Sequence, residues 1–180
     1  MPTADYTLEL AKEDFKFSSA HFTIFSADSG ELLHGHNYRV RVAVSGTRVD
    51  ELELLLDLRG LKTNIRELCE RLDSLTLIPD SCPHLELKLE ADEVEVQFGG
   101  RRYVLPRTDV RLLPLRNISV ESLARWMWCQ LAGHLDRDRA ESLAVSVEET
   151  SGQRCRYRAS LGDAVVARQR EEEGTARCPA

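Results

Sequence analysis

Hydrophobic and polar positions alternate along two segments near the start of the chain, residues 6–23 and residues 34–45. In the first segment one face carries Phe15, Phe17, Ser19 and His21. In the second, one face carries His34, His36, Tyr38, Val40, Val42 and Val44. Alternation with a period of two predicts half-buried strands, and here histidines continue the apolar face of each.

The period changes to three and four residues in two later segments, which predicts amphipathic helices over residues 57–73 and about 119–135. Asp57 and Ser119 stand at their starts and are the expected N-caps, because a short polar side chain there can accept a hydrogen bond from a free backbone N–H.

Between the helices, residues 84–114 alternate in short pieces around Gly99 and Gly100, which predicts a β meander with a hairpin turn. The segment 141–161 predicts two more strands joined at Ser151 and Gly152. The element order predicts an α+β fold, a four-stranded sheet with both helices on one face. Such an open sheet has two long edges, so self-association is expected.

The segment 1–166 is expected to form one domain, with residues 84–114 as an inserted meander. The polar segment 167–180 is expected to be a disordered tail.

Composition argues against several classes of protein, namely nucleic-acid-binding, membrane and secreted proteins. The chain has 180 residues, 42% hydrophobic and 30% charged, with a net charge of −6, typical of a soluble globular protein with no affinity for nucleic acid or membranes. The first residues do not resemble a signal peptide, and no apolar run could span a bilayer. The five cysteines are scattered and lack CxxC spacing, which favours reduced thiols and a cytoplasmic location.

Three of the five histidines, His21, His34 and His36, fall within sixteen residues and all have the inward-facing parity. Residues i and i+2 of a strand point the same way, so His34 and His36 can bind one ion, and His21 can reach it from a neighbouring strand. Catalytic zinc sites commonly have three protein ligands and one open position. The alternative is a set of ordinary core or surface histidines.

Glu149 shares a strand face with Val145 and Val147, which places a carboxylate on an apolar surface. A buried charge needs a partner. Spacing alone leaves two interpretations open: an anchor for a ligand rich in N–H donors, or a glutamate at a strand end that reaches solvent.

The motifs "FSSAH", "HGHNYRV", "LLDLRGLK", "NISVESLARWMW" and "VSVEET" occur in that order between residues 7 and 158. Together they resemble the 6-pyruvoyltetrahydropterin synthase family, which includes the bacterial 6-carboxytetrahydropterin synthases. The resemblance implies a tunnelling fold, an antiparallel sheet with a helix pair whose subunits associate into a barrel, usually a homohexamer. It also implies Zn²⁺ bound by His21, His34 and His36, a pterin ring held by Glu149 beside Thr150, and 7,8-dihydroneopterin triphosphate as substrate.

The sequence departs from the family pattern in two places. Most members have a catalytic cysteine shortly before H-G-H, whereas residues 26–33 hold Glu31 and no cysteine. This spacing is similar to the subgroup that cleaves the side chain to give 6-hydroxymethyl-7,8-dihydropterin for folate synthesis. Glu31 is therefore the expected base. The alternative interpretation is that Glu31 is an ordinary solvated carboxylate of the loop.

The second departure is at Asp73, which matches the family's catalytic aspartate but is followed by Ser74 where the family has histidine. His84 is a candidate substitute. Side-chain cleavage of a dihydropterin is the predicted reaction. The alternatives are 6-carboxy- or 6-pyruvoyl-tetrahydropterin synthesis, with a queuosine- or biopterin-type product, and zinc and pterin binding without catalysis.

Overall fold

The structure, a computed structural model, describes residues 5–162. Its strands and helices are, in chain order, β1 (Tyr6–Leu10), β2 (Lys16–His21), β3 (His34–Gly46), α1 (Leu58–Glu70), β4 (Leu75–Pro79), β5 (Glu86–Leu89), β6 (Glu93–Phe98), β7 (Arg101–Pro106), β8 (Val110–Leu113), α2 (Val120–Ala132), β9 (Ser142–Thr150) and β10 (Gln153–Ser160). A short 3₁₀ turn, Arg107–Asp109, leads into β8.

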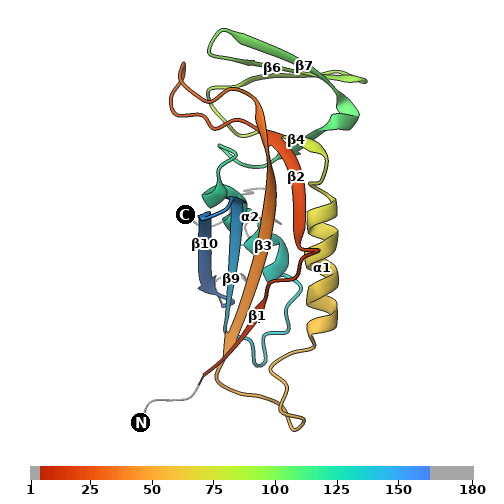
Figure 1. Cartoon of the computed structure of the whole chain (residues 1–180), viewed down its shortest axis with the longest axis vertical. Coiled ribbons are helices and arrows are strands. Elements are labelled where there is room, and N and C mark those ends of the chain that lie inside the picture. Colours follow the sequence, from red (N-terminus) through yellow and green to blue (C-terminus); the bar gives the residue numbers. More distant parts are fainter. Residues whose placement is uncertain (1–4, 163–180) are drawn as a thin grey trace.

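The main sheet has the strand order β10-β9-β3-β2-β4-β8, and β1 adds to β3 beyond the end of β2. Both helices pack into the hydrophobic core that covers one face of this sheet. Helix α2 lies against β9 and β10, and α1 lies beside β2 (Figure 1). The predicted α+β class is confirmed.

The alternation of the sequence fixes which face of the sheet is buried. On β3 the inward residues Tyr38, Val40 and Val42 are at most 2% exposed. Val40 pairs with Val147 of β9, so the apolar residues of neighbouring strands meet on the face covered by the helices.

The helix starts predicted from sequence are confirmed. The Asp57 side chain accepts a hydrogen bond from the Arg59 N–H, and Ser119 forms a reciprocal capping box with Ser122. Each cap satisfies backbone donors that have no partner inside the helix.

The main sheet has seven strands, where the sequence predicted four, and it is mixed because the β2–β4 and β4–β8 pairs are parallel. Residues 6–23 do not form one strand: a turn, in which the Phe15 N–H donates to Lys12 O, separates β1 from β2. Strand β4 was missed because its five residues are a short apolar run directly after a helix, and parallel pairing leaves no local signal.

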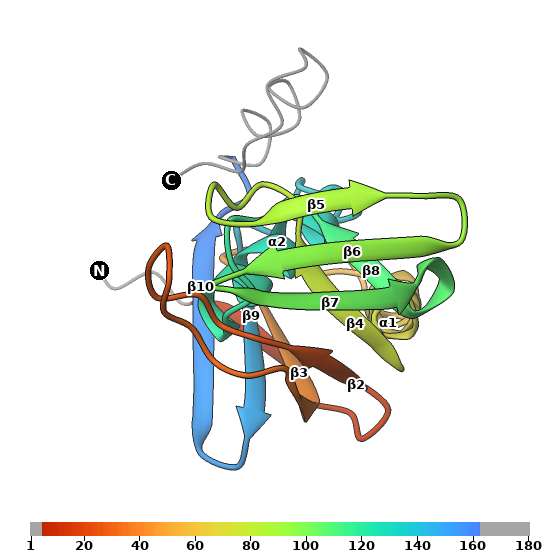
Figure 2. The ribbon, with the colours of Figure 1, turned by 90° about the horizontal axis from the view of Figure 1, so that it is seen from above.

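The predicted meander is a separate three-stranded sheet of β5, β6 and β7, which lies across one end of the molecule (Figure 2). It stops at Pro106, because β8 pairs with β4 in the main sheet. Gly99 and Gly100 have φ angles of 53° and 76° and form the β6–β7 turn, as predicted.

Residues 163–180, which include the predicted tail 167–180, lie outside the described residues. None of the helices in residues 5–162 is long and apolar enough to cross a membrane.

Candidate functional site

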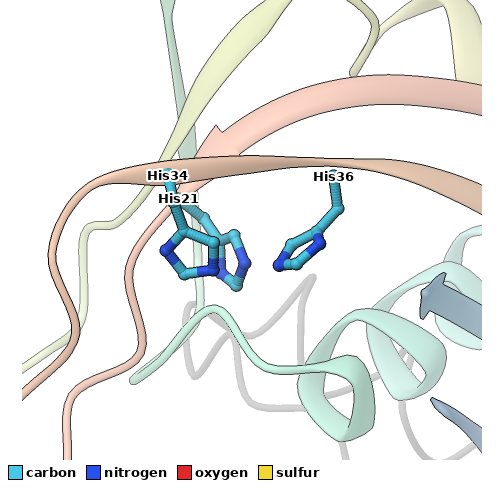
Figure 3. Close-up of side chains that lie close together, drawn as sticks. All are labelled: His21, His34 and His36. Carbon is cyan, nitrogen blue, oxygen red and sulfur yellow. The ribbon is translucent and has the colours of Figure 1, made fainter.

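Three histidines converge at the end of the β2–β3 pair. His21 pairs directly with His34 across the two strands, and Ser19 pairs with His36. The ring centroids lie 4.7 Å apart for His21 and His34, 4.7 Å for His34 and His36, and 5.3 Å for His21 and His36. Figure 3 shows the three rings on the same side of the strands. One nitrogen from each ring lies within 4.8 Å of the others, the arrangement expected of a three-histidine metal site.

Backbone carbonyls orient two of the rings. Nδ1 of His21 lies 2.9 Å from Ile118 O, and Nδ1 of His34 lies 2.8 Å from Leu32 O. A carbonyl oxygen only accepts, so each Nδ1 carries a proton, and in the neutral ring the lone pair is on Nε2. Carbonyls that hold histidines in this tautomer are typical of metal sites.

His21 Nε2 fits a metal ligand in a second respect. His21 is 1% exposed, and its Nε2 is buried without a hydrogen-bond partner. Burial lowers the pKa of His21, and the neighbouring His34 and His36 lower it further. A neutral, buried imidazole with an unpaired lone pair suits Zn²⁺ in its chemistry.

Glu31 lies on the loop between β2 and β3 and is fixed at two points to Thr23. Its carboxylate accepts a hydrogen bond from the Thr23 N–H at 3.0 Å, and its own N–H donates to Thr23 O at 2.8 Å. Burial raises the pKa of Glu31, but the hydrogen bonds from Thr23 and the charges of His34 and His21 outweigh it, so the pKa is lowered overall. Glu31 is therefore a partly exposed carboxylate whose lowered pKa keeps it ionised at neutral pH.

Glu149 is half-buried near the end of β9, two residues beyond the buried Val147. Burial raises its pKa, and the charges of His36 and Glu31 also act on it. Gln153 donates a hydrogen bond to its Oε1. Thr150 is exposed at the end of β9, with the opposite strand parity to Glu149. The charges of His36 and His34 act on Glu149, so its carboxylate lies in the electrostatic environment of the histidines, whereas no contact joins Thr150 to them in the described residues.

Asp73 is not brought to the histidines within the chain. It accepts hydrogen bonds from the Ser18 N–H at 2.6 Å and from Ser74 Oγ at 3.1 Å. It lines a cavity of about 780 Å³ together with Lys16, Arg39 and Tyr38, and none of the three histidines lines that cavity. His84 is exposed, and within residues 5–162 the close histidine group contains only His21, His34 and His36.

Tyr38 is a site residue that sequence reasoning treated only as core. Its ring is stacked on Phe17 at 4.7 Å and lies 5.8 Å from His36 and 5.9 Å from His21, and its buried hydroxyl has no partner. Burial, together with the charges of Glu149 and Glu31, raises its pKa. Tyr38 follows the H-G-H motif and has the same inward-facing parity as His34 and His36, and this position was the sign in the sequence that it belongs to the site.

Among the cysteines of the described residues, Cys69, Cys82 and Cys155 are free thiols, as expected.

Residues 9–160 match the family model described as 6-pyruvoyl tetrahydropterin synthase. The chain belongs to this family. The members of this family are enzymes that act on pterins.

Two archaeal relatives carry provisional assignments as 6-carboxy-5,6,7,8-tetrahydropterin synthases. The Methanocaldococcus jannaschii protein is 29% identical over 149 residues, covering 81% of this chain and 91% of its own. The Pyrococcus abyssi protein is 27% identical over 113 residues, covering 62% and 66%.

Solved structures share the fold. The 6-pyruvoyltetrahydropterin synthase of Plasmodium vivax superposes with a TM-score of 0.81 at 24% identity, covering 87% of this chain and 99% of that one. Variants of it described as catalytic-residue mutants, with a glutamate changed to alanine or cysteine, superpose equally well at 23% identity. The Caenorhabditis elegans family member gives a TM-score of 0.55 at 19% identity, covering 88% and 98%.

Proposed function

We propose that this family member is a zinc-dependent lyase that cleaves the side chain of 7,8-dihydroneopterin triphosphate or a related dihydropterin, releasing 6-hydroxymethyl-7,8-dihydropterin. The observation that carries this proposal is the position of Glu31, an ionised carboxylate tied to Thr23 beside the histidine cluster. No cysteine occurs in the loop of residues 22–33 that could take its place.

The Plasmodium vivax relative supports the role given to Glu31, because its catalytic-residue mutants replace a glutamate. In that protein a glutamate is therefore described as catalytic. In this chain Glu31 is the glutamate of the loop that leads into His34 and His36.

His21, His34 and His36 are the residues that would bind the zinc ion. When bound, zinc supplies Lewis-acid polarisation of a substrate oxygen. Glu149 would orient the pterin by accepting hydrogen bonds from its 2-amino group and ring N–H, as buried carboxylates do with donor-rich ligands. The neighbouring Thr150 would lie at the margin of that contact.

Glu31 would remove the proton of the 2′-hydroxyl of the substrate side chain. The electron pair of the O–H bond forms a carbonyl at C2′ as the C1′–C2′ bond breaks. The electrons of the C1′–C2′ bond move into the C6–N5 imine of the ring. The proton then returns to C1′, which leaves a hydroxymethyl group and an aldehyde fragment. No oxidant or reductant is needed, and the step asks for only one base.

Asp73 is the remaining residue assigned a catalytic role. In the isolated chain it lines a cavity that includes Tyr38 but none of the histidines, and we propose that association of subunits brings it to the reacting groups. Association is itself part of the proposal, in the form of a barrel-shaped hexamer. The terminal strand β10 offers an open sheet edge, and Phe25 and Leu32, on the Glu31 loop, are 67% and 73% exposed. Sedimentation that shows a stable monomer at micromolar concentration would refute the proposed hexamer.

The cytoplasmic location remains a prediction.

A second candidate is 6-carboxytetrahydropterin synthesis, favoured by the assignment of the Methanocaldococcus jannaschii relative. That reaction requires protons to be moved between carbon atoms, for which the family's cysteine and histidine are suited. This chain has Glu31 and Ser74 at the corresponding places.

Incubation of the zinc-loaded protein with 7,8-dihydroneopterin triphosphate, followed by mass analysis of the pterin product, distinguishes these functions. The proposal predicts 6-hydroxymethyl-7,8-dihydropterin. A 6-carboxy- or 6-pyruvoyl-tetrahydropterin product would establish the second class instead, and tight binding without turnover would show a pterin-binding protein.

A further inference from the structure

The three-stranded sheet β5–β7 lies against the loop that carries Glu31. Both belong to one small hydrophobic core, which joins Phe22 and Ile24 of the loop to Val94, Val96 and Phe98 of β6. Figures 1 and 2 show the β6–β7 turn beside the loop between β2 and β3. The inserted sheet is therefore packed on the loop that holds the proposed base.

The β6–β7 turn meets the loop at closely fitted points. A Cβ atom built on Gly30 would lie 2.7 Å from the Phe98 ring and 2.7 Å from Thr23 O, so only glycine fits there. On the other side, a Cβ on Gly99 would lie 3.1 Å from Asp28 O. The loop itself is narrow, since Ile24 and Gly30 form an isolated β-bridge.

Arg101, the first residue of β7, binds the loop backbone directly. Its Nη1 donates to Glu31 O at 2.5 Å, and its Nη2 donates to Gly30 O at 3.2 Å. The guanidinium also lies over the Phe98 ring, 5.2 Å from its centroid. The planar guanidinium donates to two consecutive carbonyls, and this fixes the position and direction of the peptide that carries the Glu31 side chain.

The contacts to Glu31 therefore come from two sides. Thr23 binds its N–H and its carboxylate, and Arg101 binds its carbonyl. A base carried on a loop is useful only when it stays within hydrogen-bond reach of the proton it removes, and loops without such contacts are mobile.

We propose that Arg101 is a positioning residue of the active site, and that the sheet β5–β7 is a brace that holds the Glu31 carboxylate beside the histidine cluster. This inference rests on the proposed function for the role of Glu31, but the brace itself is a property of the fold. Arg101 would not touch the substrate: both donors described above are already bound to the loop.

Arg102 provides a matched control. It is the next residue on β7, carries the same charge and points to the other face of the small sheet, where its guanidinium binds Glu95 at 2.5 Å. Arg102→Ala removes an equal charge and an ion pair from the same strand without touching the loop.

The first test measures hydrogen exchange of the Thr23 and Glu31 amides in the full-length protein. Both amides are bonded across the loop. Arg101→Ala should speed their exchange about tenfold or more, since bonds from a charged donor are lost, and Arg102→Ala should leave it unchanged. Arg101→Lys keeps the charge but not the planar guanidinium that donates to both carbonyls, so it should also speed exchange. Wild-type exchange in Arg101→Ala and Arg101→Lys would overturn the brace, whatever reaction the enzyme runs.

The second test is a double-mutant cycle on turnover. Arg101→Ala should lower kcat about 10- to 100-fold at unchanged zinc content, because small displacements of a catalytic group are costly. In a Glu31→Gln background the same change should add no further loss, because Arg101 acts through Glu31. Additive losses would overturn the positioning role. Wild-type turnover in Glu31→Gln alone would refute the role of Glu31 in the proposed function, while the exchange experiment would still decide the brace.

Discussion

His21 of β2 stands directly opposite His34 of β3, with 4.7 Å between the ring centroids. Direct cross-strand partners on one face have their Cβ atoms about 4.5–5.5 Å apart, so the pairing register alone brings the two rings together. His36 joins them because residues two apart on a strand share a face. The cluster is thus produced by the sheet, and no special loop geometry is needed.

Alanine substitution of any one of the three histidines should strip zinc and leave the fold intact. The strands are held by the sheet and its hydrophobic core, not by the ion. Metal analysis after dialysis, with thermal unfolding followed by circular dichroism, would measure both effects. His84→Ala is the control, because His84 is exposed and outside the cluster. Full zinc occupancy in the His34→Ala or His36→Ala variant would show that the ligands are wrongly assigned.

Glu149→Gln should weaken pterin binding at least tenfold and leave zinc in place. A hydrogen bond to a charged group contributes about 1.5–3 kcal/mol, and an amide cannot accept equally from two ligand donors. Titration calorimetry with a dihydropterin measures this. Glu148→Gln is the matched control, because Glu148 is the neighbouring residue on the opposite face and pairs with Arg41 at 3.2 Å. Equal affinities in the two variants would exclude Glu149 from the site.

The local features of this fold could be predicted from the sequence because they depend on neighbouring residues. The alternation that buries Tyr38 and Val40, and the cap of Asp57, are read from positions a few residues apart. The histidine cluster was predictable for the same reason, given that β2 and β3 pair.

Features that depend on distant contacts could not be predicted. Strand β4 pairs in parallel with β2 and β8, and nothing in its five residues shows this. Arg101 and Glu31 are 70 residues apart, so the brace becomes visible only when the inserted sheet is placed. The same holds for the cavity that Asp73 lines, which also includes Tyr38 from another part of the chain.

The inserted sheet carries an ion-pair network with a measurable pH signature. Hydrogen bonds from Arg102, Gln97 and Lys88 lower the pKa of Glu95 from 4.5 to about 2. A depressed folded-state pKa stabilises the fold above the unfolded value, so this contribution is present above about pH 4.5 and is lost as pH falls toward 2. In Arg102→Ala the pKa of Glu95, followed by NMR, should rise toward 4.5. An unshifted pKa would mean that Arg102 does not hold Glu95.

Thiol alkylation should leave activity intact. Burial raises the pKa of Cys69 to about 12 and also raises that of Cys155, so both are protonated and unreactive at neutral pH. Turnover before and after iodoacetamide treatment, with mass analysis to confirm which thiols were modified, provides the measurement. Loss of activity that tracks modification of Cys82 would transfer the base role to that thiol.

The catalytic role of Glu31 is best measured as the turnover rate of Glu31→Gln on 7,8-dihydroneopterin triphosphate at confirmed zinc occupancy. The glutamine side chain would keep the size of the glutamate and a hydrogen bond from Thr23, but it cannot accept the substrate proton. If Glu31 is the base, kcat falls by about 10²–10⁴-fold, the usual cost of removing a general base. A Glu31→Gln enzyme that turns over at the wild-type rate would show that Glu31 does not remove the substrate proton.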